Sequence, residues 1–358
     1  MGNVTIYDVA ARAGVSATTV YKAMNNLKGV SEARRASIQK LAEEMGYTSN
    51  VAAQALARRK LKIGVLFELL DSEYSRSMLD GIRSVYDDQM KNLNVAMEFA
   101  PTFEAVNKVG TLSNFEKMIT SDIDGLLFCP SMPYREFEEY NAYLEEKKLP
   151  IVLLSNRIPH LRCSSCVQYD GIALGALAGD VMNLCNPGGD YVVIVGNKDN
   201  DEQFNTIEGF RSSVRRTGGS VLCSYENRFS ENMNVSIAQD ILQTCPSATG
   251  ILVGVSQSKM ILQTLEDAGV LNRFKIVLTD NTQWARSALA SGKIQAILDR
   301  HPYQMAQCCV NLLYNEIARH QSIPPDVHLP GSIILPSAVL QTRSGEHSFA
   351  TYAKKGEI

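Results

Sequence analysis

The chain has 358 residues, of which 45% are hydrophobic and 20% are charged. This balance is typical of a globular protein with room for two or three domains. No apolar run approaches the ~20 residues of a membrane span, and the N-terminus lacks the basic and then apolar pattern of a signal peptide. The sequence therefore predicts a cytoplasmic protein with no membrane partner.

The formal net charge of −3 hides an asymmetry along the chain. Residues 1–62 contain ten Lys and Arg against four Asp and Glu, a balance of +6, which leaves −9 for the remainder. A basic head on an acidic body favours a DNA-binding head, because neutralising phosphates supplies most non-specific affinity for nucleic acid.

The first predicted element is a capped helix from Ile6 to about Ala13. Thr5 and Asp8 have the spacing at which a hydroxyl and a carboxylate satisfy the unpaired amides of a helix start. Gly14 permits the positive φ of a sharp turn after the helix. The apolar face at helical spacing consists of Ile6, Val9, Ala10 and Ala13.

A second helix is expected from Ala17 to about Met24, capped by Ser16. Val20, Ala23 and Met24 should face inward. The outward residues are Ala17, Thr18, Tyr21, Lys22 and Asn25. Small and hydrogen-bonding side chains near the start of an exposed second helix suit a reader of the DNA major groove. The pattern predicts a helix-turn-helix, and a plain three-helix module is the alternative.

A third helix is expected from Glu32 to Met45, with Ser31 as its cap and Gly46 at its end. Its apolar positions are Ile38, Leu41 and Met45. Ser31, Arg34 and Arg35 lie at its N-terminal turn, where side chains and backbone amides meet phosphate oxygens.

Residues 5–26, TIYDVAARAGVSATTVYKAMNN, resemble the DNA-binding domain of lac repressor family transcription factors, with pattern T-[IL]-x-D-V-A-x-x-A-G-V-S-x-x-T-V-S-R. The matching residues are Thr5, Ile6, Asp8, Val9, Ala10, Ala13, Gly14, Val15, Ser16, Thr19 and Val20. The resemblance implies a regulator, commonly a repressor, that binds a roughly palindromic double-stranded operator as a homodimer. We expect DNA contacts from Thr5, Tyr7, Ser16, Ala17, Thr18, Thr19, Tyr21, Lys22, Asn25, Ser31, Arg34 and Arg35.

The recognition helix departs from the family pattern at two positions. Tyr21 and Lys22 stand where the family has Ser-Arg. Lysine donates to guanine but lacks the planar fork of arginine, so we expect a weaker or shifted base preference.

Residues 49–61 are expected to form a hinge helix and linker. Asn50 caps the stretch VAAQALARRK, which is too short to be a stable helix alone. In the resembling family this segment folds when two subunits meet on the operator, and each inserts one leucine into the minor groove. The resemblance implies that Leu56 is that leucine, with Ala53 beside it, and such a wedge kinks the duplex. A plain basic linker is the alternative.

From Lys62 onward short apolar strands alternate with amphipathic helices. Strands are expected at 62–67, 94–100, 125–130, 150–155, 190–196, 220–225, 250–255, 274–280 and 293–299. Helices are expected at 75–89, 114–121, 136–147, 172–184, 206–217, 234–244, 258–268 and 303–320. This alternation favours parallel sheets with right-handed crossovers, in two α/β subdomains joined by several crossings.

The tandem arrangement resembles the periplasmic-binding-protein fold that the lac repressor family carries after its hinge. We therefore predict a multi-domain chain, with an all-α helix-turn-helix head and an α/β core of two doubly wound parallel-sheet subdomains. The expected ranges are the head at 1–48, hinge and linker at 49–61, an effector-binding and dimerisation core at 62–340 and a polar tail at 341–358. Within the core, the first subdomain is expected at 62–157 and 285–322, and the second at 158–284 and 323–340. The tail lacks the apolar heptads of a tetramerising coiled coil.

Ligands of such sheets bind beyond the carboxyl ends of the strands. The predicted effector residues at this edge are Tyr74, Ser131, Asn156, Asp170, Thr206, Ser256, Asp280, Trp284 and Arg300. By resemblance, Tyr74 stacks on a ligand and Asp280 accepts hydrogen bonds from sugar hydroxyls. Tyr74 equally suits the core, and for Trp284 we favour burial of a domain crossing over stacking on a sugar.

Several family ligand positions are altered. Thr206 replaces a usual arginine, Val255-Ser256 replace Asn-Asp, and Arg300 stands where glutamine is common. The positively charged side chain that contacts the ligand is thus expected at Arg300, on another side of the cleft, and not at position 206. We hypothesise a small polar effector, a sugar or sugar derivative, bearing a carboxylate or phosphate that a guanidinium pairs with bidentately. A structural bridge between subdomains is an equal alternative for Arg300.

Motifs of other function classes are missing. The sequence has no G-x-G-x-x-G after the first strand, no G-x-x-x-x-G-K-[ST], no H-E-x-x-H and no G-x-S-x-G. Five scattered histidines and a lone C-x-x-C at Cys163 and Cys166 give weak support for metal or redox chemistry. We expect no enzyme activity, no cofactor and no metal. The alternatives are a solute-binding receptor and an α/β enzyme without a recognisable motif.

Overall fold

The computed structural model describes residues 4–24, 29–47, 59–68, 71–101, 107–228, 230–255 and 258–341. Contacts divide the chain into two compact units, residues 1–60 with 92–94 and residues 61–91 with 95–358. We call the first the head and the second the core. Some predicted site residues lie outside the described residues, and these are Asn25, Asn50, Ala53, Leu56 and Ser256. Most of the predicted hinge and the tail from residue 342 lie outside them as well.

The head contains the predicted helices α1 (Ile6–Ala13), α2 (Ala17–Met24) and α3 (Glu32–Glu44). Its buried side chains are Val9, Ala10, Val20, Ala23, Ile38 and Ala42. Ala42 takes the place that we expected for Leu41, because Ala42 follows Ile38 by four residues and so shares its helix face. Met24 and Met45 pack against this cluster from its edge.

The core begins with a six-stranded sheet of order β11-β5-β4-β3-β1-β2. Its strands are β1 (Leu61–Phe67), β2 (Val95–Pro101), β3 (Gly125–Cys129), β4 (Ile151–Leu154), β5 (Ser165–Tyr169) and β11 (Asp326–Leu329). Every pairing between these strands is parallel. Parallel strands end at one common edge, which fixes where a ligand meets the sheet.

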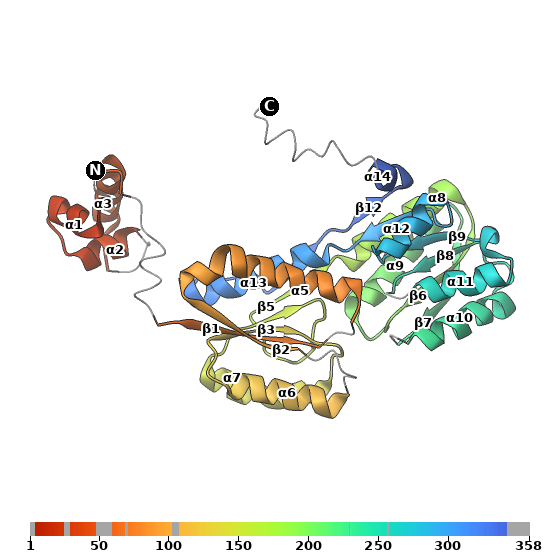
Figure 1. Ribbon diagram of the computed structural model, residues 1–358, viewed down its shortest axis with the longest axis horizontal. Helices are drawn as coiled ribbons and strands as arrows, with labels where there is room; N and C mark the ends of the chain where they lie inside the picture. Colours follow the sequence, from red (N-terminus) through yellow and green to blue (C-terminus); the bar gives the residue numbers. More distant parts are fainter. Residues whose placement is uncertain are drawn as a thin grey trace. The chain divides into compact units, whose positions relative to one another are not determined.

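Helices cover both faces of this first sheet, as Figure 1 shows. On one face lie α5 (Glu73–Val85) and α13 (Pro302–Arg319), which pack closely together. They approach so closely that a Cβ at Gly81 would overlap the carbonyl oxygen of Tyr303. On the other face lie α6 (Lys108–Thr120) and α7 (Asn141–Lys147), with the 3₁₀ turn η3 (Arg135–Tyr140). The chain from α5 to β2 passes through the short helices η1 (Tyr86–Met90) and η2 (Lys91–Leu93).

The second six-stranded sheet has the order β12-β10-β9-β8-β6-β7. Its strands are β6 (Asp190–Val195), β7 (Ser220–Glu226), β8 (Gly250–Val253), β9 (Lys275–Leu278), β10 (Ala296–Asp299) and β12 (Ser332–Ile334). All described pairings are parallel except that of β12 with β10. The two sheets confirm the predicted parallel α/β architecture.

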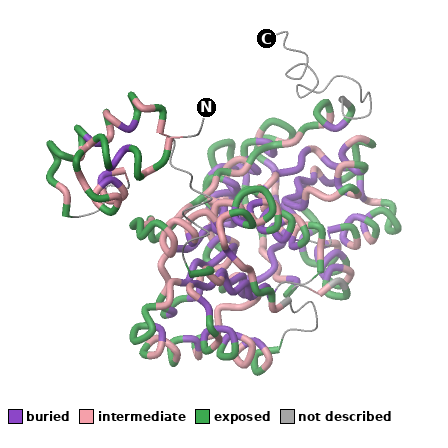
Figure 2. Tube along the Cα trace, turned by 60° about the vertical axis from the view of Figure 1, so that its left-hand side comes forward, coloured by how far each residue is buried: buried purple, intermediate pink, exposed green. Residues whose placement is uncertain are grey.

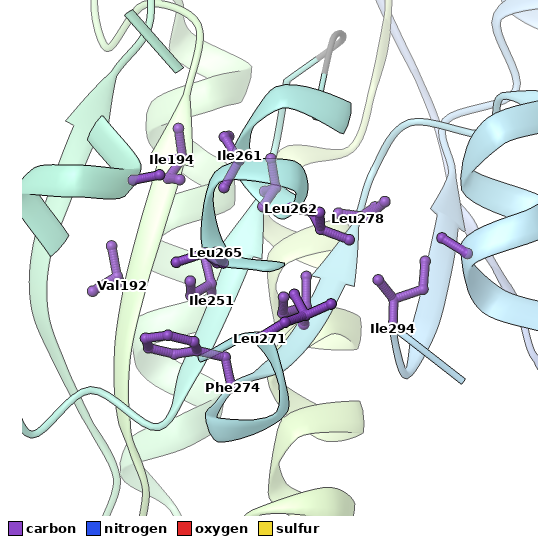
Figure 3. Close-up of a cluster of buried hydrophobic side chains, with 14 of the residues drawn as sticks. Val192, Ile194, Ile251, Ile261, Leu262, Leu265, Leu271, Phe274, Leu278 and Ile294 are labelled. Atoms are coloured by element: carbon purple, nitrogen blue, oxygen red, sulfur yellow. The ribbon is translucent and has the colours of Figure 1, made fainter. Parts of the chain in front are cut away.

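The helices of the second sheet form two layers (Figure 1). These helices are α8 (Gly171–Cys185), α9 (Asp201–Arg215), α10 (Glu231–Thr244), α11 (Lys259–Asp267) and α12 (Gln283–Ala290). Figure 3 shows the apolar cluster in which Leu265 and Phe274 pack against strand residues such as Ile251. The turn η4 (Leu271–Arg273) leads into β9, and α14 (Pro336–Gln341) packs on α12. Figure 2 shows buried positions concentrated inside the core and exposed positions around its outside.

The predicted subdomain ranges are wrong in part. We expected 158–284 and 323–340 in the second subdomain, but β5 and β11 pair within the first sheet. We also expected 285–322 in the first subdomain, but β10 pairs with β9 in the second sheet. In the described part of the chain, the backbone crosses between sheets after β5, after β10 and after β11. The strand β5, sequence SCVQY, was missed because Ser165 and Gln168 interrupt its apolar pattern, although all five residues are buried.

Two predicted helices begin five or more residues earlier than expected. Helix α6 starts at Lys108 instead of residue 114, and α9 starts at Asp201 instead of residue 206. An asparagine cap explains each start, since Asn107 accepts from the Gly110 amide at 2.8 Å and Asn200 from the Gln203 amide at 3.1 Å.

Candidate functional site

The head holds its first helix with the predicted capping box. The hydroxyl of Thr5 accepts from the Asp8 amide at 3.3 Å, and the Asp8 carboxylate accepts from the Thr5 amide at 2.8 Å. The Asp8 carboxylate also accepts from the Thr5 hydroxyl at 2.6 Å, and this hydrogen bond, followed by that from the Thr5 amide, lowers the pKa of Asp8 below its ordinary value. Gly14 then takes a left-handed φ of 62°, which turns the chain toward α2.

Helix α2 begins at the predicted cap. The Ser16 hydroxyl accepts from the Thr19 amide at 3.1 Å and lies 2.9 Å from the Thr19 hydroxyl. Thr18 is exposed, Ala17, Tyr21 and Lys22 are partly buried, and Val20 and Ala23 face the core of the head. The outward face therefore carries the small, hydroxyl and cationic side chains expected of a groove reader.

Helix α3 presents an exposed N-terminus. Ser31 occupies the N-cap position, but its side chain makes no capping hydrogen bond, contrary to the cap predicted from the sequence. Ser31 and Arg34 are exposed, and Arg35 is partly buried. On α1, Tyr7 is 73% exposed although it is aromatic. Exposed amides and cations at a helix start are suited to phosphate oxygens.

The core contains a cavity of ≈ 210 Å³ at the carboxyl ends of both sheets. The lining residues are Glu73, Tyr74, Ser77, Thr279, Asp280, Asn281, Asp299, Arg300, Pro302, Tyr303 and Gln304. They come from the start of α5, the end of β9, and the segment between β10 and α13. The cavity therefore lies where the chain passes from one sheet to the other. We call it the effector cavity.

Arg300 is the central cation of the effector cavity. It is only 8% exposed, and its guanidinium carbon lies 4.0 Å from the ring centre of Tyr74 and 5.7 Å from that of Tyr169. Burial raises the pKa of Tyr169 to about 12 and also raises that of Tyr74, while the charge of Arg300 opposes both shifts. Both rings are therefore neutral near pH 7.

Two of the three carboxylates of the effector cavity accept hydrogen bonds from neighbouring residues. Asp299 accepts from the His301 amide at 2.8 Å and from the Asn281 side chain at 2.6 Å. Glu73 accepts from the Gln283 amide at 3.0 Å, and this bond joins α5 to the start of α12. Asp280 is buried at 4% exposure. Such groups accept hydrogen bonds from hydroxyls of a polar ligand.

Further contacts join the half of the core built on the first sheet to the half built on the second sheet. Asn156, after β4, accepts from the side chain of Asn200 at 2.5 Å, and it donates to the Pro130 carbonyl at 2.7 Å. His328 of β11 lies 3.1 Å from Glu202 of α9. Because these pairs span the two halves, any change of the angle between the halves must rearrange them.

The structure brings together only part of the predicted effector residues. Tyr74, Asp280 and Arg300 line the effector cavity. Ser131, Asn156, Asp170, Thr206 and Trp284 do not line it. Asp170 caps α8, accepting from the Ala173 amide at 2.8 Å, and the Thr206 hydroxyl donates to the Glu202 carbonyl at 2.7 Å within α9.

Trp284 lies on α12 and packs against the core cluster of the second sheet. It lines a separate hollow of ≈ 150 Å³ with Leu262 of α11 and Lys293. It therefore neither lies at a crossing between sheets, as we favoured, nor stacks in the effector cavity.

Several lining residues had no sequence signal of their own. Thr279 and Asn281 flank Asp280, and Asp299 precedes Arg300, so each is adjacent to a residue that we did predict. These residues could be predicted only if it were known that the ends of β9 and β10 lie next to each other in the sheet. Within the described residues no group of three His, Cys, Asp or Glu is placed to hold a metal ion, and no helix is long and apolar enough to cross a membrane.

Comparison with family profiles gives two matches. Residues 5–50 match bacterial regulatory proteins of the lacI family, and residues 63–321 match the periplasmic binding protein domain. Together the two matches cover the head, its capping and turn residues, and almost all of the core.

Similar curated proteins are transcription regulators. The chain is 25% identical over 295 residues to catabolite control protein A of Priestia megaterium, an alignment that covers 78% of this chain and 83% of that protein. It is 28% identical to the probable transcriptional repressor ExuR of Bacillus subtilis, over 60% of this chain and 59% of that protein.

Solved structures resemble the core in fold. The glucose-galactose binding protein GanP of Geobacillus stearothermophilus matches with a TM-score of 0.70 at 20% identity, covering 78% of this chain and 99% of that one. A putative LacI transcriptional regulator of Bacteroides fragilis matches with a TM-score of 0.66 at 14% identity, over 79% of this chain and 99% of that one.

Proposed function

We infer the function from one premise: the chain belongs to the lacI family of bacterial regulatory proteins, and its core is a periplasmic binding protein domain. It is a DNA-binding transcription regulator, of the repressor type, whose output a small metabolite controls. The observation that carries this function is the presence in one chain of a capped helix-turn-helix and a polar cavity at the carboxyl ends of two sheets.

For DNA recognition, we propose that α2 enters the major groove. Thr18, Tyr21 and Lys22 are then placed to meet base edges, while Ser31 and Arg34 at the start of α3 meet phosphates. Thr5, Tyr7, Ser16, Ala17, Thr19, Asn25 and Arg35 complete the proposed contact surface. The net positive charge of residues 1–62 supports this assignment.

We further propose that the protein acts as a homodimer on a two-fold symmetric operator. Residues 49–61 form the hinge in this proposal, with Asn50 as its cap and Leu56, beside Ala53, as the wedge in the minor groove. Family membership supports the arrangement. A regulator of bacterial genes works where the genome is, so we place it in the cytoplasm.

For control by metabolite, we propose that the effector binds in the effector cavity and changes the angle between the two halves of the core. Tyr74 and Ser77 belong to α5 of the first half, and Thr279 and Asp280 follow β9 of the second half. One ligand touching both groups alters the balance between open and closed forms by its differential affinity. The sugar-binding structural relative supports a sugar or sugar derivative as ligand. We propose binding without turnover.

The test is selection of binding sites from randomised duplexes with the full chain, repeated at two salt concentrations. A two-fold symmetric site, with an affinity that falls steeply with salt, is expected. Enrichment of no sequence at either salt concentration would contradict sequence-specific regulation, whatever ligand the core binds.

A further inference from the structure

The edge of the Arg300 guanidinium that carries Nε and Nη2 has no hydrogen-bond acceptor among the described residues. The atoms Nε and Nη2 are both buried, and neither has a hydrogen-bond partner among the residues that the structure describes. These two nitrogens lie on the same edge of the planar guanidinium, the edge whose parallel N–H bonds match the two oxygens of a carboxylate. Burying charged donors without an acceptor is strongly unfavourable, so the edge calls for a partner.

The aromatic neighbours of Arg300 do not meet this need. Tyr74, whose ring centre lies 4.0 Å away, and Tyr169, at 5.7 Å, interact with the cation through their π-systems. Such contacts stabilise the charge but leave the N–H groups of the edge without an acceptor. Because burial raises the pKa of both phenols, neither tyrosine supplies an anion near neutral pH.

The other charges of the effector cavity limit which anion fits. Glu73, Asp280 and Asp299 line the cavity with Arg300, so three carboxylates accompany one cation. A dianionic phosphate would be repelled more strongly than a single carboxylate. The same oxygens, together with the Asn281 amide and the buried Thr279 hydroxyl, suit a ligand rich in hydroxyl groups.

The size of the effector cavity favours a small ligand. Its volume of ≈ 210 Å³ lies below the range of about 300–1,000 Å³ that is usual for pockets of drug-sized ligands. A single sugar ring or an open-chain acid of similar size fits this scale better than a disaccharide.

We propose that the effector is a sugar acid, a polyhydroxylated monocarboxylate whose carboxylate pairs with the Nε and Nη2 edge of Arg300. This inference rests on the proposed function of the effector cavity. Arg300 lies on the segment that crosses from β10 to α13, and it lines the cavity together with Tyr74 of one half and Asp280 of the other. Without an anion, the unbonded edge favours an open form in which water reaches it. A bound carboxylate accepts hydrogen bonds from both nitrogens, which removes the unfavourable free energy of burying them without an acceptor and favours the closed form.

The experiment measures binding of matched ligand pairs to the full chain by calorimetry. D-Glucuronate is compared with D-glucose and D-galacturonate with D-galactose, which differ at C6 alone, and D-gluconate with sorbitol. D-Glucose 6-phosphate serves as the phosphate probe. We expect at least one acid to bind ~30-fold or more tighter than its neutral counterpart and tighter than the phosphate, as a charge-assisted pair implies.

Two variants assign the preference to Arg300. Arg300→Gln removes the charge and should bring acid and neutral affinities within about threefold of each other. Arg300→Lys keeps the charge without the fork, and an intermediate preference is expected. Arg319→Gln, which removes an exposed arginine 5.6 Å from the Tyr314 ring, is the matched control and should keep the full preference.

The outcomes separate this inference from the proposed function. Neutral sugars binding as well as every acid, tightest binding of the phosphate, or no binding of any acid each overturn the sugar-acid assignment. An acid preference that survives in Arg300→Gln overturns the role of Arg300. If selection from randomised duplexes still yields an operator in those cases, the proposed regulator function stands. If that selection yields no operator, the proposed function is contradicted, whatever the calorimetry of the ligands shows.

Discussion

The head and the core place their candidate sites in different ways. In the head, the proposed DNA-reading residues of α2 are neighbours in sequence, held by local caps at Thr5 and Ser16. In the core, the lining of the effector cavity comes from three separate segments, at 73–77, 279–281 and 299–304. A local motif therefore defines the first site, whereas the second depends on how two parallel sheets bring strand ends together.

The energetic basis of the two units differs as well. The head is built around small side chains, with Ile38 the largest fully enclosed apolar residue named in its core. The core of the chain buries large rings in clusters, such as Phe115, Phe128 and Phe137. We thus expect the head to depend more on caps and the core more on packing. The following predictions test that contrast, from the largest effect to the smallest.

Phe128→Ala should weaken the core most. The Phe128 ring is fully buried, 5.1 Å from the Phe115 ring and 5.5 Å from the Phe137 ring. Truncating a buried phenylalanine costs roughly 3–5 kcal/mol of unfolding free energy. Trp284, the single tryptophan, lies in the core, so its fluorescence during urea unfolding reports this unit alone. Val109→Ala, at a side chain that is 78% exposed, is the control and should change little.

Lys22→Ala tests the reading face of the head. If Lys22 meets a guanine edge, its loss should cost about 1–3 kcal/mol of operator affinity and relax base preference at one position. Lys40→Ala removes the same charge from an exposed site paired with Glu44 at 3.9 Å. Binding is measured on selected and scrambled duplexes. Equal losses for both variants would mean that Lys22 acts only through its charge.

Glu68→Gln tests the effect of burial in the core. Glu68 follows β1, is fully buried, and burial raises its pKa from the ordinary 4.5 to about 7. The folded core therefore holds this proton where the unfolded chain has lost it, so stability falls as pH rises from about 4.5 to about 7. The variant should melt higher than wild type at and above neutral pH, and its melting temperature should vary less across that window. An unchanged pH profile would show that Glu68 does not titrate there.

Thr5→Ala should have the smallest effect on stability, and only the head should be destabilised. Losing a helix cap costs about 1 kcal/mol. The Asp8 pKa, lowered by Thr5, should return toward its ordinary 3.8. A lowered pKa means that Asp8 stabilises the head above 3.8 and that this contribution is lost as pH falls through the folded pKa. Far-UV circular dichroism melts across acid pH should show this loss in wild type and less of it in the variant. Thr18→Ala, at an exposed residue within α2, should match wild type.

The sequence was sufficient for features whose cause is local. The capping box of Thr5, the left-handed turn at Gly14 and the cap at Ser16 each depend on residues within a few positions, and all three are confirmed. Most strands of the core are also confirmed, because buried parallel strands are continuous apolar runs.

Features that depend on distant residues were missed. Gln168 looks like a loop residue in sequence, but β5 lies between β4 and β11 in the sheet, α13 packs on it, and all five of its residues are buried. The short strand β12 pairs with β10 along Ser332, Ile333 and Ile334, a contact that no local pattern indicates. Thr206 was expected in the cleft because it stands where the resembling family has a ligand-binding arginine. Its hydroxyl instead donates a hydrogen bond to the Glu202 carbonyl within its own helix.

The most direct test of the account is reciprocal coupling between the effector cavity and the DNA-reading head. Operator affinity of the full chain is titrated with the effector found by calorimetry, and effector affinity is titrated with and without operator. We predict that the effector changes operator affinity, that the operator changes effector affinity by the same factor, and that Asp280→Asn reduces effector binding while unliganded operator affinity stays. An effector that fills the cavity but leaves operator affinity unchanged would contradict metabolite control.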